Sequence, residues 1–104
     1  MLTIPIKKKW FEMILSGEKK EEYREIKLYW TSRFLKLWQG SLIGGKAEQT
    51  VRFRNGYGEN VPSAIATVTL SVGEGKTEWG AVPGNRYYIL HIAQVKPEQE
   101  ADND

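Results

Sequence analysis

The stretch SGEKKEEYR, residues 16–24, holds the densest chemistry of the chain and joins a helix-like run to a strand-like one. Gly17 is a natural helix-ending residue because glycine takes positive φ without a Cβ clash, and the charges begin where that helix stops. If Glu22 and Arg24 lie on one strand, their spacing of two puts both side chains on the same face. The stretch therefore predicts that a carboxylate, a guanidinium and the nearby ammonium of Lys19 converge.

The same stretch also has a purely structural interpretation. Charged edge strands are common because charge discourages edge-to-edge aggregation, and alternating Lys, Glu and Arg often form a solvated salt-bridge ladder. In either case, strand geometry points Tyr23 away from the face that carries Glu22 and Arg24.

Composition indicates one globular domain without a metal. The chain has 104 residues, 40% hydrophobic and 12% aromatic, which is enough for a single packed core. It has no cysteine, which excludes disulfides, thiolate metal sites and a cysteine nucleophile. Its one histidine, His91, cannot build a His-rich zinc site and is interpreted as structural. We expect no metal and no cofactor.

The termini and the charge distribution bear on location and partners. Residues 1–6 are too short for a secretory signal and no run reaches transmembrane length, so we expect a cytoplasmic protein without membrane contact, monomeric by default. Residues 97–104 hold four of the 13 acids and none of the 15 bases, so residues 1–96 carry a net charge of +6. This charge favours a phosphate-bearing partner and equally serves solubility.

Hydrophobic periodicity predicts two helices and five strands. Apolar stripes with helical spacing cover 7–16 and 29–38, and alternating or β-rich runs cover 2–6, 20–26, 50–54, 63–72 and 86–96. The segment 40–49 is expected to be a loop, 73–85 a loop or a short helical turn, and Asn55-Gly56 a turn. Loops rather than helices join the later strands, which predicts an α+β fold: a small, mostly antiparallel, partly open β-barrel with two short helices packed on it. Residues 1–96 form this domain, and the acidic segment 97–104 is predicted to be a disordered tail.

Several side chains outside the opening stretch are candidates for ligand contact. Trp10 has two interpretations, a stacking platform for a ligand or a core residue, and it is assigned to the core because aromatic residues on helical apolar stripes are usually buried. The basic edge of the second helix and the polar face of the strand 50–54 are not explained by packing, and neither is a Glu-Trp pair in the last loop. The candidates are Trp30, Arg33, Arg52, Arg54, Glu78 and Trp79.

The spacing Gly17-x-Lys19-x-x-Glu22-x-Arg24 resembles the G-x-K-x-x-E-x-R signature of the ASCH domain, a branch of the PUA-like superfamily. The run IKKKWF at 6–11, leading into ILSG at 14–17, resembles family members. The runs YRE at 23–25, YW at 29–30 and EWGA at 78–81 resemble a stand-alone subgroup associated with phages and bacteria. The resemblance spans roughly residues 2–96 in element order, and 40–62 contributes little to it.

This resemblance implies a PUA-like barrel with a cleft between barrel and helix that binds RNA or a modified nucleoside. Carried onto this chain, it makes Lys19, Glu22 and Arg24 cleft residues, with Gly17 setting the turn. Some similar small members are amidohydrolases that deacetylate N4-acetylcytidine. Their pattern has Lys at the position of Lys19, Thr where this chain has Glu22, and a further Glu from a later segment.

Two functional hypotheses follow, and a third is not excluded. In the first, the chain binds RNA or a modified nucleoside: Lys19, Arg24, Arg33, Arg52 and Arg54 meet phosphates, and Trp30 or Trp79 stacks on an unpaired base. In the third hypothesis, which also involves binding alone, the basic face docks another protein. The second hypothesis involves catalysis.

In the second hypothesis the chain is an amidohydrolase. Burial and the charge of Arg24 lower the pKa of Lys19, which becomes a base or nucleophile, whereas Glu22 would raise that pKa. Glu22 or Glu78 relays a proton, and Arg24 stabilises an oxyanion.

Overall fold

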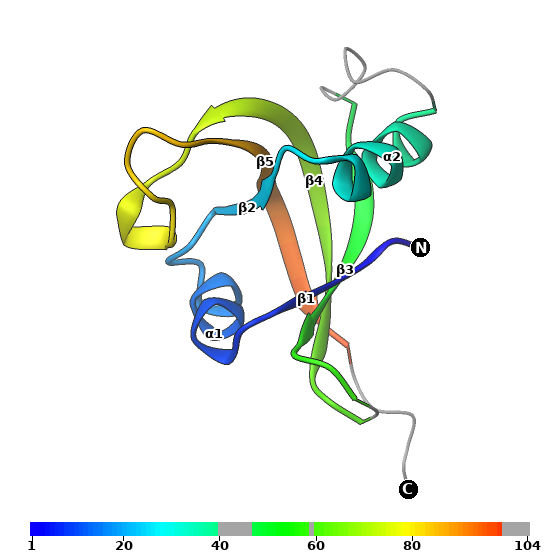
Figure 1. Cartoon of the computed structure of the whole chain (residues 1–104). Coiled ribbons are helices and arrows are strands. Elements are labelled where there is room, and N and C mark those ends of the chain that lie inside the picture. Colours follow the sequence, from blue (N-terminus) through cyan, green and yellow to red (C-terminus); the bar gives the residue numbers. More distant parts are fainter. Residues whose placement is uncertain (40–46, 59, 99–104) are drawn as a thin grey trace, which may run out of the picture.

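Five strands form one mixed sheet in the order β1-β3-β4-β5-β2, with a helix near each end of it (Figure 1). The structure is a computed structural model that describes residues 1–39, 47–58 and 60–98. Its elements in chain order are β1 (Thr3–Ile6), α1 (Lys8–Ser16), β2 (Glu21–Glu25), α2 (Leu28–Leu37), β3 (Gln49–Asn55), β4 (Ser63–Glu74), the 3₁₀ turn η2 (Thr77–Trp79) and β5 (Arg86–Pro97).

The predicted α+β class and all seven predicted helices and strands are confirmed. Only the pairing of β1 with β3 is parallel, so the sheet is mostly antiparallel, as expected. The largest boundary difference is in β4, which continues to Glu74 because its last residues pair with the start of β5. The predicted loop 40–49 falls mostly outside the described residues, and its last residue, Gln49, already belongs to β3. Among the described strands, the two at the sheet edges, β1 and β2, do not pair with each other, so the sheet is open.

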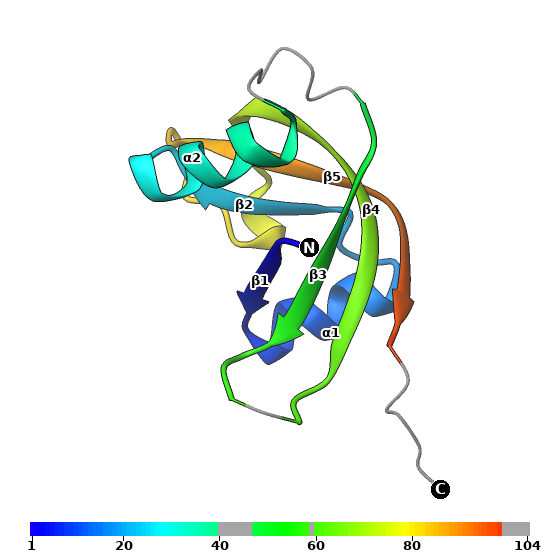
Figure 2. The same cartoon turned by 90° about the vertical axis from the view of Figure 1, so that its right-hand side faces the viewer.

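The core lies on one face of this curved sheet and takes side chains from both helices. Strand alternation buries Val51 and Phe53 on β3, and in the register of β3 with β4 each lies opposite a fully buried alanine. α1 contributes Phe11 and Ile14 to the same cluster, and α2 contributes Phe34 and Trp38, so the helices share one core. Figure 2 shows the curvature of the sheet.

The end of α1 confirms the role predicted for Gly17 and sets the position of Lys19. Gly17 has φ of 86° and donates its N–H to the carbonyl of Ile14, at 3.1 Å. The N–H of Lys19 then donates to the carbonyl of Met13 at 2.9 Å, which folds the chain back over the last turn. The chain therefore enters β2 with Lys19 already held against the helix.

The C-terminal boundary differs from the prediction. Pro97 is the last residue of β5, and Glu98 donates its backbone N–H to the carbonyl of Ser63 at 2.9 Å. The first two residues of the segment predicted as a disordered tail are therefore held on the sheet, because strand pairing with β4 continues that far. Residues 99–104 lie outside the described residues. In the described part of the chain, no helix has the length and apolar character that crossing a membrane requires.

We predict that Phe34→Ala strongly destabilises the fold. The Phe34 side chain is fully buried and its ring lies 5.2 Å from that of Tyr88, so truncation leaves a cavity between α2 and β5. The free energy of unfolding, measured by urea denaturation, should fall by about 3–5 kcal/mol. Leu28→Ala on the same helix is the control, since Leu28 is 81% exposed and its loss should cost under about 0.5 kcal/mol. Equal effects would contradict the packing of α2 into the core.

Candidate functional site

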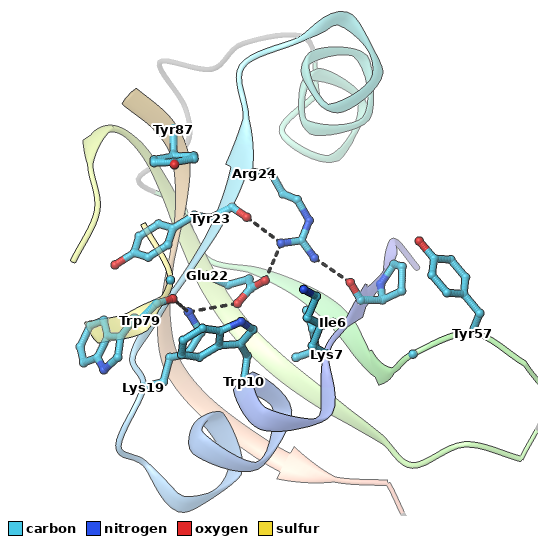
Figure 3. A pocket seen from close by; sticks show the side chains of 13 residues that line it. Ile6, Lys7, Trp10, Lys19, Glu22, Tyr23, Arg24, Tyr57, Trp79 and Tyr87 are labelled. Carbon is cyan, nitrogen blue, oxygen red and sulfur yellow. Dashed lines mark hydrogen bonds and ion pairs between the residues drawn. The ribbon is translucent and has the colours of Figure 1, made fainter. Parts of the chain in front are cut away.

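A pocket of about 500 Å³ lies beside the open edge of β2 (Figure 3). Its walls come from segments far apart in the chain: β1 and the start of α1, the signature stretch, the turn after β3, η2 and the start of β5. The lining residues are Pro5, Ile6, Lys7, Trp10, Lys19, Glu22, Tyr23, Arg24, Gly56, Tyr57, Trp79, Gly80 and Tyr87.

A chain of polar contacts crosses this pocket from η2 to β1. Lys19 Nζ donates to the main-chain carbonyl of Trp79 at 2.8 Å and lies 3.2 Å from Glu22 Oε1. The other carboxylate oxygen of Glu22 accepts from Arg24 Nη1, and Arg24 Nη2 donates to the carbonyl of Pro5 at 2.7 Å. Side chains thereby join β2 to β1, the two strands whose backbones are unpaired with each other (Figure 3).

These contacts confirm the predicted convergence of Lys19, Glu22 and Arg24. Lys19 is 1% exposed and Glu22 is 5% exposed, so the interpretation as a solvated ladder is wrong for this group. That interpretation does fit the next pair, Lys27 and Glu25, because both side chains are more than half exposed. Along the chain, charge thus changes from buried at Lys19 and Glu22 to solvated at Glu25 and Lys27.

Burial lowers the pKa of the Lys19 ammonium from its ordinary value of 10.5. Glu22 opposes this shift, and the positive charge of Arg24 adds to it. Because Glu22 is shared between two cations, a charged Lys19 leaves the group with one net positive charge in a largely desolvated place. The balance that the sequence left open is decided in favour of a lowered pKa.

Aromatic rings enclose the Lys19 ammonium. Its Nζ lies 4.8 Å from the centre of the Tyr23 ring and 5.1 Å from the Trp10 ring, distances at which a cation is attracted to a ring face. Trp10 is half-buried and forms part of the pocket wall, so its assignment to the core is corrected. Its helical stripe is wide enough for Phe11 and Ile14 to fill the core while Trp10 lies at the margin.

Tyr23 reaches the pocket although it lies on the opposite face of β2 from Glu22. Its hydroxyl donates to Glu21 Oε1 at 2.7 Å and accepts from the N–H of Lys76 at 2.9 Å. Because β2 is an edge strand and the pocket lies beyond that edge, side chains from both faces line it. Burial raises the pKa of the Tyr23 hydroxyl well above its usual range, and its donated hydrogen bond to Glu21 adds to the effect.

The Glu21 carboxylate that accepts the hydrogen bond from Tyr23 also contacts His91. Glu21 Oε2 lies 3.6 Å from His91 Nδ1, and His91 Nε2 is 2.6 Å from the hydroxyl of Ser71. His91 therefore has the satisfied structural role that the sequence predicted.

Two glycines allow the loop around η2 to close onto these rings. A Cβ at Gly75 would lie 2.6 Å from ring carbons of Tyr23 and 2.8 Å from the Cβ of Ala81. A Cβ at Gly80 would lie 3.0 Å from the Trp10 ring, and Gly80 has φ of 103°. The close approach of this loop brings the Trp79 carbonyl to Lys19.

The two candidates from this loop do not take the places expected for them. Glu78 is exposed and is not part of the pocket lining, so the structure does not bring it together with Lys19. The Trp79 indole points away from the Lys19 amine in Figure 3 and lies under Lys76 Nζ, 4.9 Å from the ring centre. Trp79 therefore contacts Lys19 through its main chain, which no side-chain pattern in the sequence could indicate.

The other candidate residues lie outside this pocket. The Trp30 ring packs against the guanidinium of Arg24, whose Cζ lies 5.2 Å from the centre of that ring. Arg33 is exposed, and its Cζ lies 3.5 Å from the centre of the Tyr29 ring. Arg52 and Arg54 lie on β3, where Arg52 is bound by Glu98. Arg54 lines one hollow with Arg52 and another with Trp30, and Arg33 lines neither of these two.

Three further lining residues were not singled out by sequence reasoning: Lys7, Tyr57 and Tyr87. Tyr57 follows the turn after β3 and is 85% exposed. The signal available in the sequence was an aromatic residue directly after Asn55-Gly56. In the part of the chain that the structure describes, no group of three or more His, Cys, Asp or Glu side chains could hold a metal ion. No protein-family model, no curated protein and no solved structure matches this chain.

We predict that the Lys19 side chain titrates below 10.5, as followed by ¹³Cε or ¹⁵Nζ NMR across alkaline pH. Glu22→Gln should lower the pKa of Lys19 further, because it removes the strongest opposing charge while keeping the shape of the side chain. Glu21→Gln is the matched control and should lower it less, since Glu21 makes the smallest contribution. A midpoint at or above 10.5 would contradict the balance of effects described above.

Proposed function

We propose that this chain is an ASCH-type, PUA-like domain that binds a nucleoside-type ligand with the base in the pocket around Lys19. The observation that carries the proposal is the arrangement of a buried ammonium, a carboxylate and a main-chain carbonyl within aromatic walls. A volume of about 500 Å³ is within the range typical of small-molecule sites. The curved sheet, whose open edge is bridged by Arg24, is consistent with a partly open barrel.

The pocket has what recognition of a base requires. A base offers flat π-faces for stacking, and the rings of Trp10, Tyr23 and Tyr87 line the pocket. Its edge offers hydrogen-bond donors and acceptors, which the Lys19 amine and the Glu22 carboxylate complement. These polar groups are held by several contacts each, so they are organised before a ligand binds.

A single base is favoured over an extended RNA segment. Proteins that follow a nucleic-acid strand use a continuous positive groove, whereas here Arg52 is neutralised by Glu98 and Arg33 is stacked on Tyr29. The ligand is therefore either a free nucleoside or one unstacked nucleoside of an RNA.

We expect at least one compound from a panel of the four ribonucleosides and N4-acetylcytidine to bind, as measured by isothermal titration calorimetry. Trp10→Ala should weaken that binding about 5- to 160-fold, because loss of one stacking surface costs roughly 1–3 kcal/mol. Leu15→Ala, on the same helix and outside the pocket lining, should leave it unchanged. If Trp10→Ala and wild type bind alike, or nothing on the panel binds, the proposal fails.

A second candidate is hydrolysis of an acylated nucleoside, favoured by the lowered pKa of Lys19 next to Glu22. Water would add to the amide carbonyl, the Lys19 amine would take the proton of that water, and the proton would pass to the leaving amine of the base. The C–N bond of the amide breaks, and the products are the free base amine and a carboxylic acid, which ionises to the carboxylate by releasing its proton to solvent. Two predicted helpers are poorly placed for this: Arg24 already donates to Glu22, Tyr23 and Pro5, and Glu78 lies outside the pocket. Binding is therefore the first proposal.

If the chain is an amidohydrolase, it should release acetate from N4-acetylcytidine, and Lys19→Ala should abolish turnover. The rate should rise with pH through the folded-state pKa of Lys19, which is lowered from 10.5, because the neutral amine is the active form. Glu78→Gln should leave the rate unchanged. Absence of turnover on acylated cytidine, adenosine and guanosine would exclude this candidate and leave the binding proposal standing.

A further inference from the structure

A second hollow, of about 670 Å³, adjoins the Lys19 pocket. It shares Pro5, Gly56 and Tyr57 with that pocket, so the two hollows lie next to each other along β1 and the turn after β3. The remaining lining residues are Thr3, Lys27, Tyr29, Trp30 and Arg54. Two of these are cationic and none of the lining residues is acidic.

Strand pairing places Arg54 next to the polar chain of the first pocket. Arg54 is the register partner of Pro5 on the neighbouring parallel strand, and paired strands lie about 4.8 Å apart. The carbonyl of the same Pro5 accepts the hydrogen bond from Arg24. The Arg54 backbone is thus one strand away from the residue that ends the Lys19-Glu22-Arg24 chain.

The positive charge of Arg54 is not balanced by a carboxylate among the described residues. Arg54 donates to the carbonyl of Gly58, which carries no charge. Arg52, two residues earlier, is bound through Nε and Nη2 by both carboxylate oxygens of Glu98, at 2.7 and 3.0 Å. The two arginines share a strand and a backbone geometry, yet within residues 1–39, 47–58 and 60–98 only Arg52 is paired with a carboxylate.

Lys27 adds a second cation to the hollow. Its partner Glu25 lies 3.0 Å away, but both side chains are more than half exposed, and such surface pairs are weak and easily exchanged.

We propose that this hollow binds the phosphate of a nucleotide whose base occupies the Lys19 pocket. The inference rests on the proposed function and refines it: the ligand is a nucleotide, or one nucleotide of an RNA, rather than a free nucleoside. The planar guanidinium of Arg54 suits two phosphate oxygens, and Lys27 supplies a further positive charge. Tyr57 lines both hollows, and Trp30 lines the one proposed for the phosphate.

The test compares each nucleoside of the panel with its 5′-monophosphate and its 3′-monophosphate at low and moderate salt. We expect one of the two monophosphates to bind at least about tenfold more tightly than the nucleoside, with the advantage shrinking as salt is added. Arg54→Gln should remove that advantage and leave nucleoside affinity unchanged, and Arg54→Lys should retain part of it. Arg52→Gln is the matched control and should retain all of it.

Equal binding of nucleoside and both monophosphates would overturn the phosphate site and leave the nucleoside pocket intact. Loss of the advantage to the same extent in Arg52→Gln would overturn it as well, because the effect would then reflect overall charge. Ribose 5-phosphate binding as tightly as the nucleotides would show that the base pocket is unused. If neither nucleosides nor monophosphates bind, the proposed function itself fails and this inference fails with it.

Discussion

The carboxylate of Glu22, shared between Lys19 and Arg24, is the interaction on which the rest of this structure depends. The backbones of β1 and β2 do not pair with each other, and the chain of contacts through Glu22 spans the distance between η2 and β1 in their place. Removing one member of such a buried group typically costs about 3–5 kcal/mol, because the remaining charges lose their compensation. Replacing the whole group by well-packed apolar residues is often neutral, so the net stabilisation from the intact group is small compared with the cost of removing one member.

The same interaction organises the pocket. It holds the Lys19 amine against the Trp79 carbonyl and beside two rings, and it keeps a carboxylate at 5% exposure within a space open to small molecules. Groups held this firmly need no rearrangement to meet a ligand. The glycines at 75 and 80 complete the arrangement, since a side chain at either position would collide with a pocket ring.

Much of the fold and part of the site could be predicted from local pattern. Gly17 ended the helix as expected, because a positive φ is a property of a few adjacent residues, and Glu22 and Arg24 shared a face because strand alternation is local. Trp10 was misassigned because a helical stripe does not show where the core ends. Glu78 was misplaced because a glycine-rich loop has no period from which side-chain direction could be inferred. The pairing of Arg52 with Glu98 joins residues far apart in sequence, for which no spacing rule exists.

The sequence by itself determined the class of fold, the order of its elements and the grouping of Lys19, Glu22 and Arg24, since each follows from backbone propensities and short spacings. The tertiary structure decided the burial of these three side chains, the pKa of Lys19 and the partners of its amine. Burial outweighed Glu22 and lowered the pKa of Lys19, and a main-chain carbonyl from η2 became its partner. The curvature of the sheet brought the edge strands β1 and β2 around one pocket. These outcomes depend on desolvation and on long-range approach, which arise only when distant segments pack together.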